Sequence, residues 1–120
     1  MKVVIIDDEP LARMELAYLI EATHLVDAIY QGESIEDAFQ LILTHQPDVL
    51  FLDIHLTDES GLDLAKRLSQ VPNAPLIIFA TAYDNHAVEA FEVNALDYVL
   101  KPFEQARIQS CLLYTSPSPR

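Results

Sequence analysis

Hydrophobic and polar positions form blocks along this chain rather than alternating residue by residue. Short apolar runs at residues 3–6, 26–30, 49–52, 76–80 and 98–100 predict five buried strands. Between these runs, apolar residues return every three or four positions, which predicts amphipathic helices. Every strand is too apolar to leave one face in water. The pattern therefore predicts an α/β fold, a parallel sheet with helices on both faces.

Four of the expected helices have a recognisable start signal: a proline suited to a first turn, a Ser-x-x-Asp capping pattern, or an aspartate. The signals are Pro10, Ser34 with Asp37, Ser60 with Asp63, and Asp84; the apolar faces are Ala12, Leu16, Leu19 and Ile20, then Ile35, Ala38, Leu41 and Ile42, then Leu62, Ala65 and Leu68, then Ala87, Val88 and Phe91.

Polar residues gather where the predicted strands end. Right-handed crossovers place the carboxyl ends of parallel strands at one edge of the sheet, and open α/β sheets bind ligands there. The residues at these ends are Asp7 and Asp8, Asp53, Thr81 with Ala82, and Lys101 with Pro102. Three carboxylates, a hydroxyl and an ammonium group should therefore face one crevice.

Adjacent carboxylates repel one another, and a hard divalent cation such as Mg²⁺ removes the conflict. A Mg²⁺ ion beside a lysine and a threonine is a group of charges that stabilises a transferring phosphoryl group. Asp53 is the candidate nucleophile, because it ends a central strand and could form an aspartyl phosphate. Asp7 and Asp8 lie at the flank and can bind metal.

Each feature also has a simple structural interpretation. An acidic pair after a strand is often a helix start, Asp53 could begin a turn, and Lys-Pro is common at strand ends. Their coincidence at the ends of four different strands favours the functional interpretation.

The chain resembles the receiver domain of two-component response regulators over residues 2 to about 109. The segments that carry the resemblance are VVIIDDEPLAR, PDVLFLDIHLTDESGLDLAK, PLIIFATAY and AFEVNALDYVLKPF, and the last is most like receivers of LytTR-type (LytR/AlgR-like) transcription regulators. The resemblance implies a flavodoxin-like sheet of order 2-1-3-4-5.

The resemblance also implies a role for individual residues. Asp53 matches the phosphoacceptor, and Mg²⁺ is expected on Asp8, Asp7, Asp53 and the backbone carbonyl of His55. Thr81, Ala82 and Lys101 match phosphoryl-binding positions, Thr81 and Tyr98 the switch pair, and Pro102 a proline after a cis peptide bond. His55 and Tyr83 should border the mouth of the site and modulate hydrolysis of the phosphate.

Two segments depart from the family pattern. Leu56-Thr57 stands where receivers commonly have Met-Pro or Leu-Pro, and the missing proline is expected to loosen the loop. The end of the chain, with its TSPSPR sequence, is unsuited to helix. We therefore predict a receiver domain over residues 1–109 with an incomplete fifth helix, and a non-native or truncated tail over 110–120.

Composition limits the partners. The net charge is −12 with seven Lys and Arg residues, which argues against nucleic-acid binding by this domain alone. No apolar stretch approaches the ~18 residues that cross a bilayer. The single cysteine, Cys111, fits a reducing compartment, so a cytoplasmic location is expected.

The leading function is that of a signalling phosphoacceptor rather than an enzyme. Its implied partners are a sensor histidine kinase and, after phosphorylation, a second copy bound through the helix 4–strand 5–helix 5 face, with an absent DNA-binding domain as output. An aspartate-nucleophile phosphatase is an alternative, although His55 stands where such enzymes need a second acid. A phosphorylation-independent interaction module is the third interpretation.

Overall fold

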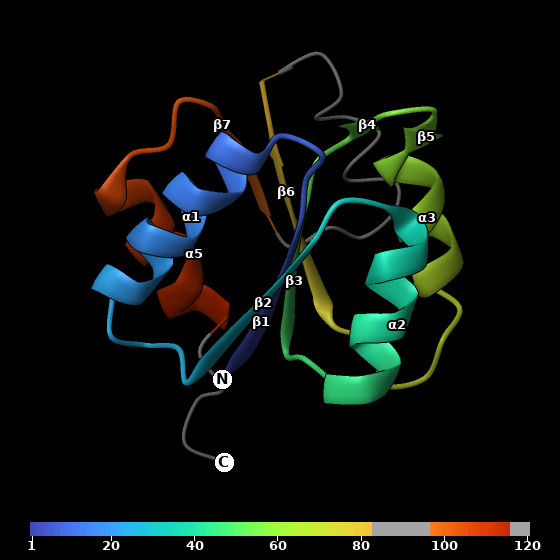
Figure 1. Cartoon of the computed structure of the whole chain (residues 1–120). Helices are drawn as coiled ribbons and strands as arrows, with labels where there is room; N and C mark the ends of the chain where they lie inside the picture. The colour runs from blue at the N-terminus through green and yellow to red at the C-terminus, as the bar shows by residue number, and fades with distance from the viewer. Residues whose placement is uncertain (83–96, 116–120) are drawn as a thin grey trace.

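A five-stranded parallel sheet lies at the centre of the computed structural model, which describes residues 1–82 and 97–115 (Figure 1). Its strands are β1 (Lys2–Ile6), β2 (Ala28–Gly32), β3 (Val49–Leu52), β6 (Leu76–Thr81) and β7 (Asp97–Leu100), in the order β2-β1-β3-β6-β7. All four neighbouring pairs are parallel. Counted by these strands alone, the order is the predicted 2-1-3-4-5, and the flavodoxin-like fold is confirmed.

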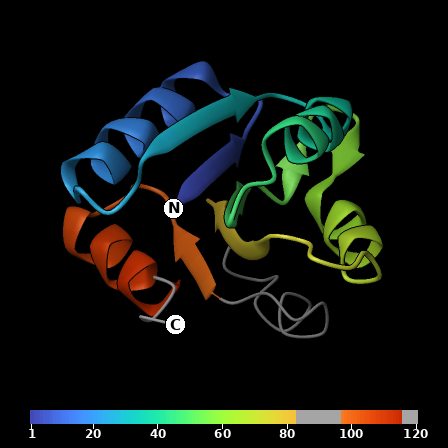
Figure 2. The same ribbon diagram turned by 90° about the horizontal axis from the view of Figure 1, so that it is seen from below.

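Helices cover both faces of the sheet (Figures 1 and 2). Helices α1 (Pro10–Ala22) and α5 (Gln105–Thr115) lie on one face, and α2 (Ile35–His45) and α3 (Gly61–Leu68) on the other. Side chains alternate between the two layers along β1: Val3 and Ile5 pack with α1 and α5, whereas Val4 and Ile6 pack with α2 and α3. Both faces are buried, which is why the strands are continuously apolar.

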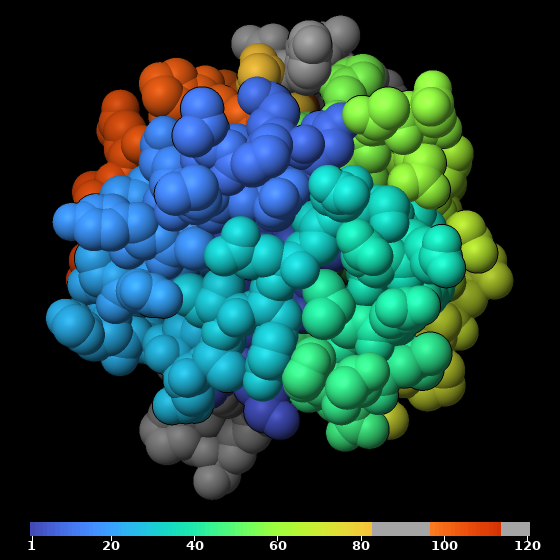
Figure 3. Space-filling model, in the orientation of Figure 1, coloured from blue at the N-terminus to red at the C-terminus, as the bar shows by residue number. Residues whose placement is uncertain are grey.

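Strand β2 differs from its prediction by two residues, because it spans Ala28–Gly32 rather than 26–30. Val26 belongs to the preceding loop and packs against the α1–α5 core. Asp27 is held at the amino end of β1, where its carboxylate lies 2.5 Å from the N-terminal ammonium group and its N–H donates to the Met1 carbonyl. The sequence placed the start of this strand two residues early because Val26 is apolar and half-buried although it lies in the loop. Figure 3 shows this half-buried edge strand between the side chains of α1 and α2.

The two Ser-x-x-Asp signals differ in how they are used. Ser34 caps α2, since its hydroxyl accepts a hydrogen bond from Asp37 N–H at 3.1 Å. The Asp37 carboxylate in turn accepts from Glu33 N–H at 3.0 Å. Ser60 occupies the cap position of α3, but its side chain makes no capping hydrogen bond with the described residues. The Ser60-x-x-Asp63 pattern therefore predicted the start of α3 correctly, but the predicted capping hydrogen bond is not formed.

Helix α5 continues past the predicted domain boundary at residue 109. Ile108, Cys111 and Leu112 are fully buried in the α1–α5 core. Burial raises the pKa of the Cys111 thiol to about 12, so this cysteine stays protonated and unreactive. The origin of the end of the chain stays a prediction, and residues 116–120 and the predicted fourth helix after Asp84 lie outside the described ranges. None of the described helices is long and apolar enough to cross a membrane.

A salt bridge between Arg107 and Asp97 connects α5 to β7. The Arg107 guanidinium donates to both carboxylate oxygens of Asp97, at 2.5 and 3.0 Å, and to the Tyr98 carbonyl at 3.2 Å. Burial alone would raise the pKa of Asp97, but hydrogen bonds from Arg107 and from Tyr98 N–H, with the charge of Arg107, hold it below its ordinary value of 3.8. The stabilisation is therefore present above pH 3.8 and is lost as the pH falls through the lower folded pKa.

We expect Asp97→Asn to lower the free energy of unfolding by about 1 kcal/mol at pH 7, because partly exposed ion pairs contribute about that much. The loss should shrink as the pH falls below 4. Urea unfolding at several pH values measures it, and in an Arg107→Gln background the same substitution should have a smaller effect. A loss that does not depend on pH would contradict the ion-pair explanation.

Candidate functional site

Asp7 and Asp53 follow two neighbouring strands, β1 and β3, and their backbones are anchored just beyond the strand ends. Asp7 N–H donates to the Gly32 carbonyl at 3.1 Å, and Asp53 N–H donates to the Ile6 carbonyl at 3.0 Å. Both side chains are buried, each residue being 4% exposed. The loops that follow these strands gather at the top of Figure 1. The sheet therefore delivers two carboxylates into one crevice, as the sequence predicted.

Four carboxylates meet at this edge. One oxygen from each of Asp7, Asp8, Glu9 and Asp53 lies within 4.8 Å of those of the others. Asp8 is half-buried and Glu9 is exposed. Glu9 was not among the predicted site residues, although its place directly after Asp7-Asp8 could have indicated it.

Lys101 binds three of these carboxylates. Its ammonium nitrogen lies 2.8 Å from Asp7 Oδ2, 3.0 Å from Glu9 Oε1 and 3.1 Å from Asp53 Oδ2. The backbone N–H of Lys101 donates a hydrogen bond to the Thr81 carbonyl at 2.9 Å, and this bond continues the pairing of β6 with β7. Burial would lower the pKa of Lys101, but hydrogen bonds to Asp7 and Glu9 and the charge of Asp53 raise it above its ordinary value. The lysine is therefore a permanent cation in the site.

One lysine does not compensate for all the acids. Burial, assisted by the negative charge of Asp53, raises the pKa of Asp7 despite its hydrogen bonds with Lys101 and Glu9 N–H. Four carboxylates share one ammonium group, so the cluster is short of positive charge when all of them are ionised. Its donors are all carboxylate oxygens, and hard cations such as Mg²⁺ prefer these ligands. The residues fit a Mg²⁺ ion by both charge and donor type.

A small hairpin borders the cluster. It is formed by β4 (His55–Leu56) and β5 (Glu59–Ser60), paired antiparallel. His55 N–H donates to Asp53 Oδ1 at 3.2 Å, while the His55 side chain is exposed. One oxygen of Asp53 is therefore oriented by the hairpin and the other by Lys101. A role of the exposed His55 side chain at the mouth of the site stays a prediction.

Gly61 allows the start of α3 to pass directly over the backbone of Asp53. Its N–H donates to the Ile54 carbonyl at 2.7 Å. A β-carbon at residue 61 would lie 2.1 Å from the Asp53 carbonyl oxygen and 3.0 Å from its carbonyl carbon. These atoms are backbone, so they cannot turn aside as a side chain can.

Gly61→Ala should therefore destabilise the domain by about 2 kcal/mol, as overpacking in a well-packed region does. The other glycine is the comparison, because a β-carbon at Gly32 would meet side-chain atoms only, the Asp37 β-carbon at 2.7 Å and the Ile6 Cδ1 methyl group at 3.0 Å, so we expect a smaller loss there. Urea unfolding of both variants tests the difference. Equal losses in the two variants would mean that the close approach to Asp53 is not the cause.

The structure describes all but one of the remaining predicted residues. Thr81 is fully buried at the end of β6, and Ala82 follows it exposed. Tyr98 on β7 is half-buried, with its ring 6.2 Å from that of Phe79. The Lys101-Pro102 peptide bond is cis, as the resemblance implied. Tyr83 lies outside the described residues.

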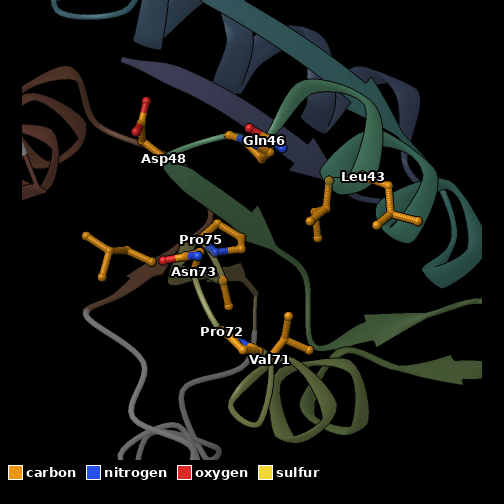
Figure 4. Close-up of a pocket in the computed structure, with 11 residues that line it drawn as sticks. Leu43, Gln46, Asp48, Val71, Pro72, Asn73 and Pro75 are labelled. Atoms are coloured by element: carbon orange, nitrogen blue, oxygen red, sulfur yellow. The ribbon is translucent and has the colours of Figure 1, made fainter.

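A groove at the opposite edge of the sheet has a different character. It has a volume of about 670 Å³ and is lined by residues that precede β3 and β6, including Asp48 and Pro75 (Figure 4). Leu43 and Val71 add apolar surface to it. The groove lies at the amino ends of the strands, and none of its lining residues belongs to the acidic cluster.

Sequence and structure comparisons identify relatives of the whole domain. Residues 3–113 match the family described as response regulator receiver domain. Sensory transduction protein LytT of Enterococcus faecalis is 53% identical over 108 residues, which are 90% of this chain and 45% of that protein. Sensory transduction protein LytR of Streptococcus agalactiae is 51% identical over 114 residues, 93% of this chain and 46% of that protein. The chain thus spans less than half the length of these relatives.

A solved structure agrees with the sequence matches. The response regulatory domain of protein mrkE from Klebsiella pneumoniae superposes with a TM-score of 0.87 at 38% identity, covering 96% of this chain and 94% of that one. The range 3–113 that matches the family includes both the acidic cluster and the helices around it. The chain belongs to the response regulator receiver domain family, and within it to the receivers of LytT- and LytR-like regulators.

Proposed function

We propose that this receiver accepts its phosphoryl group on Asp53. The observation that carries the proposal is the position of Asp53, a buried carboxylate that follows the central strand β3, between the acids after β1 and the end of β6. Lys101 binds one of its oxygens and His55 N–H the other, and the oxygens of Asp7 and Asp8 lie beside it. An Asp53 oxygen would attack the phosphorus atom, and the bond from phosphorus to the donor would break as the donor leaves.

Mg²⁺ is proposed as the cofactor, held by Asp8, Asp7 and Asp53 with the backbone carbonyl of His55. The fit rests on the all-oxygen donor set and on the charge that Lys101 leaves uncompensated. When bound, Mg²⁺ supplies positive charge to the transferring phosphoryl oxygens. Glu9 and Asp53 both bind the Lys101 ammonium group, so Glu9 competes with Asp53 for this lysine.

The chain's own groups complete the site. Lys101 stays charged and is placed to pair with a phosphoryl oxygen. Thr81 and Ala82, at the end of the neighbouring strand β6, are proposed to donate hydrogen bonds to the other oxygens. His55 lies at the mouth, and we propose that its ring, with Tyr83, limits the access of water to the aspartyl phosphate. Substitution of either residue by alanine should shorten the phosphate lifetime, measured as phosphate release.

The output of this receiver is proposed to depend on Thr81 and Tyr98. Movement of the Thr81 hydroxyl toward a phosphoryl group would leave space behind it, and the half-buried Tyr98 ring could then swing inward. The surface near β7 and α5 would change and favour a homodimer through the face formed by β7, α5 and the predicted helix after Asp84. Sedimentation before and after phosphorylation tests this proposal.

A cytoplasmic histidine kinase is the proposed phosphoryl donor, and a DNA-binding domain is the proposed target.

The proposed acceptor is tested by incubating the chain with acetyl phosphate and Mg²⁺ and mapping the modified residue by mass spectrometry. We expect one phosphoryl group, on Asp53, and none when a chelator removes Mg²⁺. Stable incorporation on another residue would contradict the proposal. Phosphotransfer from a purified histidine kinase would then test the physiological donor.

A further inference from the structure

Thr57 connects the hairpin to the acidic cluster. It lies in the turn between β4 and β5, and its hydroxyl donates a hydrogen bond to Asp8 Oδ2. The two residues are 49 positions apart in the sequence. Thr57 itself is exposed, so this bond is a local contact at the surface of the site.

Other contacts hold the turn in place. Leu56 is 6% exposed and packs in the α2–α3 core. The Glu59 carboxylate accepts a hydrogen bond from Ile35 N–H at 3.1 Å, and Asp58 has a positive φ of 59°, which aspartate tolerates. The Thr57 hydroxyl is thus not needed to build the hairpin. Its contribution is to the carboxylate that it contacts.

We propose that Thr57 is a positioning residue that orients Asp8 for the metal ion. The inference rests on the proposed role of Asp8 as a Mg²⁺ ligand. An ionised carboxylate has about four acceptor positions, so one hydroxyl leaves the others for the cation. Asp8 is half-buried on a short loop, and a fixed hydrogen bond restricts its rotation before metal binds. Hydrogen-bond partners of metal ligands change metal affinity by about 10- to 100-fold.

The identity of residue 57 also separates this chain from the common receiver pattern. Receivers commonly carry proline here, and proline has no side-chain donor. Its absence was expected to loosen the loop, yet the structure shows a hydroxyl that bridges the loop to Asp8. A different residue therefore provides a connection that proline cannot make.

The test compares Thr57→Val, which keeps the shape and removes the hydroxyl, with Thr57→Ser, which keeps the hydroxyl. Thr44→Val is the matched control, because Thr44 is an exposed threonine on α2. Calorimetric titration with MgCl₂ should show about tenfold weaker binding for Thr57→Val and an affinity within about twofold of the parent for Thr57→Ser. The Mg²⁺ affinity of Thr44→Val should equal that of the parent.

Melting temperatures without metal separate positioning from a structural role. We expect Thr57→Val to melt at most about 5 °C below the parent in EDTA, because one hydrogen bond at the surface contributes little to stability. Unchanged or tighter Mg²⁺ binding in Thr57→Val, an equal loss in Thr57→Ser, or a larger drop in the metal-free melting temperature of Thr57→Val would overturn the inference. A parent chain that takes up phosphate on a residue other than Asp53 would overturn the proposed acceptor but not this result.

Discussion

Asp53→Asn should take up no phosphoryl group from acetyl phosphate and Mg²⁺ under conditions that label the parent chain. Asparagine has nearly the shape of aspartate, and its amide oxygen can still accept the hydrogen bond from His55 N–H. It has no anionic oxygen to attack phosphorus, so the covalent step is lost while the fold is kept. Intact-mass spectrometry measures the labelled fraction directly.

Asp58→Asn is the matched control for this experiment. Asp58 lies in the adjacent hairpin turn, is exposed, and has a positive φ that asparagine also adopts. This variant should be labelled as fully as the parent. If Asp53→Asn were labelled to the same extent as Asp58→Asn, the acceptor would be another residue and the proposed chemistry would be wrong.

Lys101→Met should lower the free energy of unfolding of the metal-free domain by about 3 kcal/mol at pH 7. Methionine keeps much of the lysine's apolar length but removes the charge that lies within 3.1 Å of Asp7, Glu9 and Asp53. Two of these carboxylates are buried, and removing one partner of a buried ion pair typically costs about that much. Urea unfolding in EDTA measures the loss.

Added Mg²⁺ should recover part of this stability, because the ion binds the folded cluster and supplies the missing positive charge. Lys66→Met on α3 is the control, since Lys66 is exposed, lies in the last turn of α3 and has no salt bridge with the acidic cluster among the described residues. It should change the stability little. A Lys101→Met domain as stable as the parent in EDTA would show that the carboxylates do not depend on this lysine.

The sequence was sufficient for the sheet because its strands are buried on both faces. Val3 to Ile6 and Val49 to Leu52 are uniformly apolar, and a run of this kind has few alternatives to a central parallel strand. The edge strand was placed less well. β2 has one neighbour and is half-buried, so its sequence carries polar Gln31 and Gly32 and its limits were misplaced by two residues.

The place of the acidic cluster could also be predicted from the sequence, whereas the roles of its residues stay predictions. Asp7, Asp53, Thr81 and Lys101 each end a strand, and parallel strands with right-handed crossovers must bring such residues to one edge. Their types then indicated the chemistry. The meeting of these residues at one edge of the sheet was therefore determined by local pattern and strand direction.

The contacts among these residues were decided by the tertiary structure alone. Lys101 forms a salt bridge with Glu9, 92 positions away in the sequence, and Thr57 donates a hydrogen bond to Asp8, 49 positions away. Gly61 lies so close to the Asp53 backbone that a β-carbon at residue 61 would overlap with it. Periodicity records which face a residue occupies, but it contains no information on the distance between two loops. Those distances depend on how the hairpin and helices pack on the sheet, and they determine which carboxylate each donor can reach.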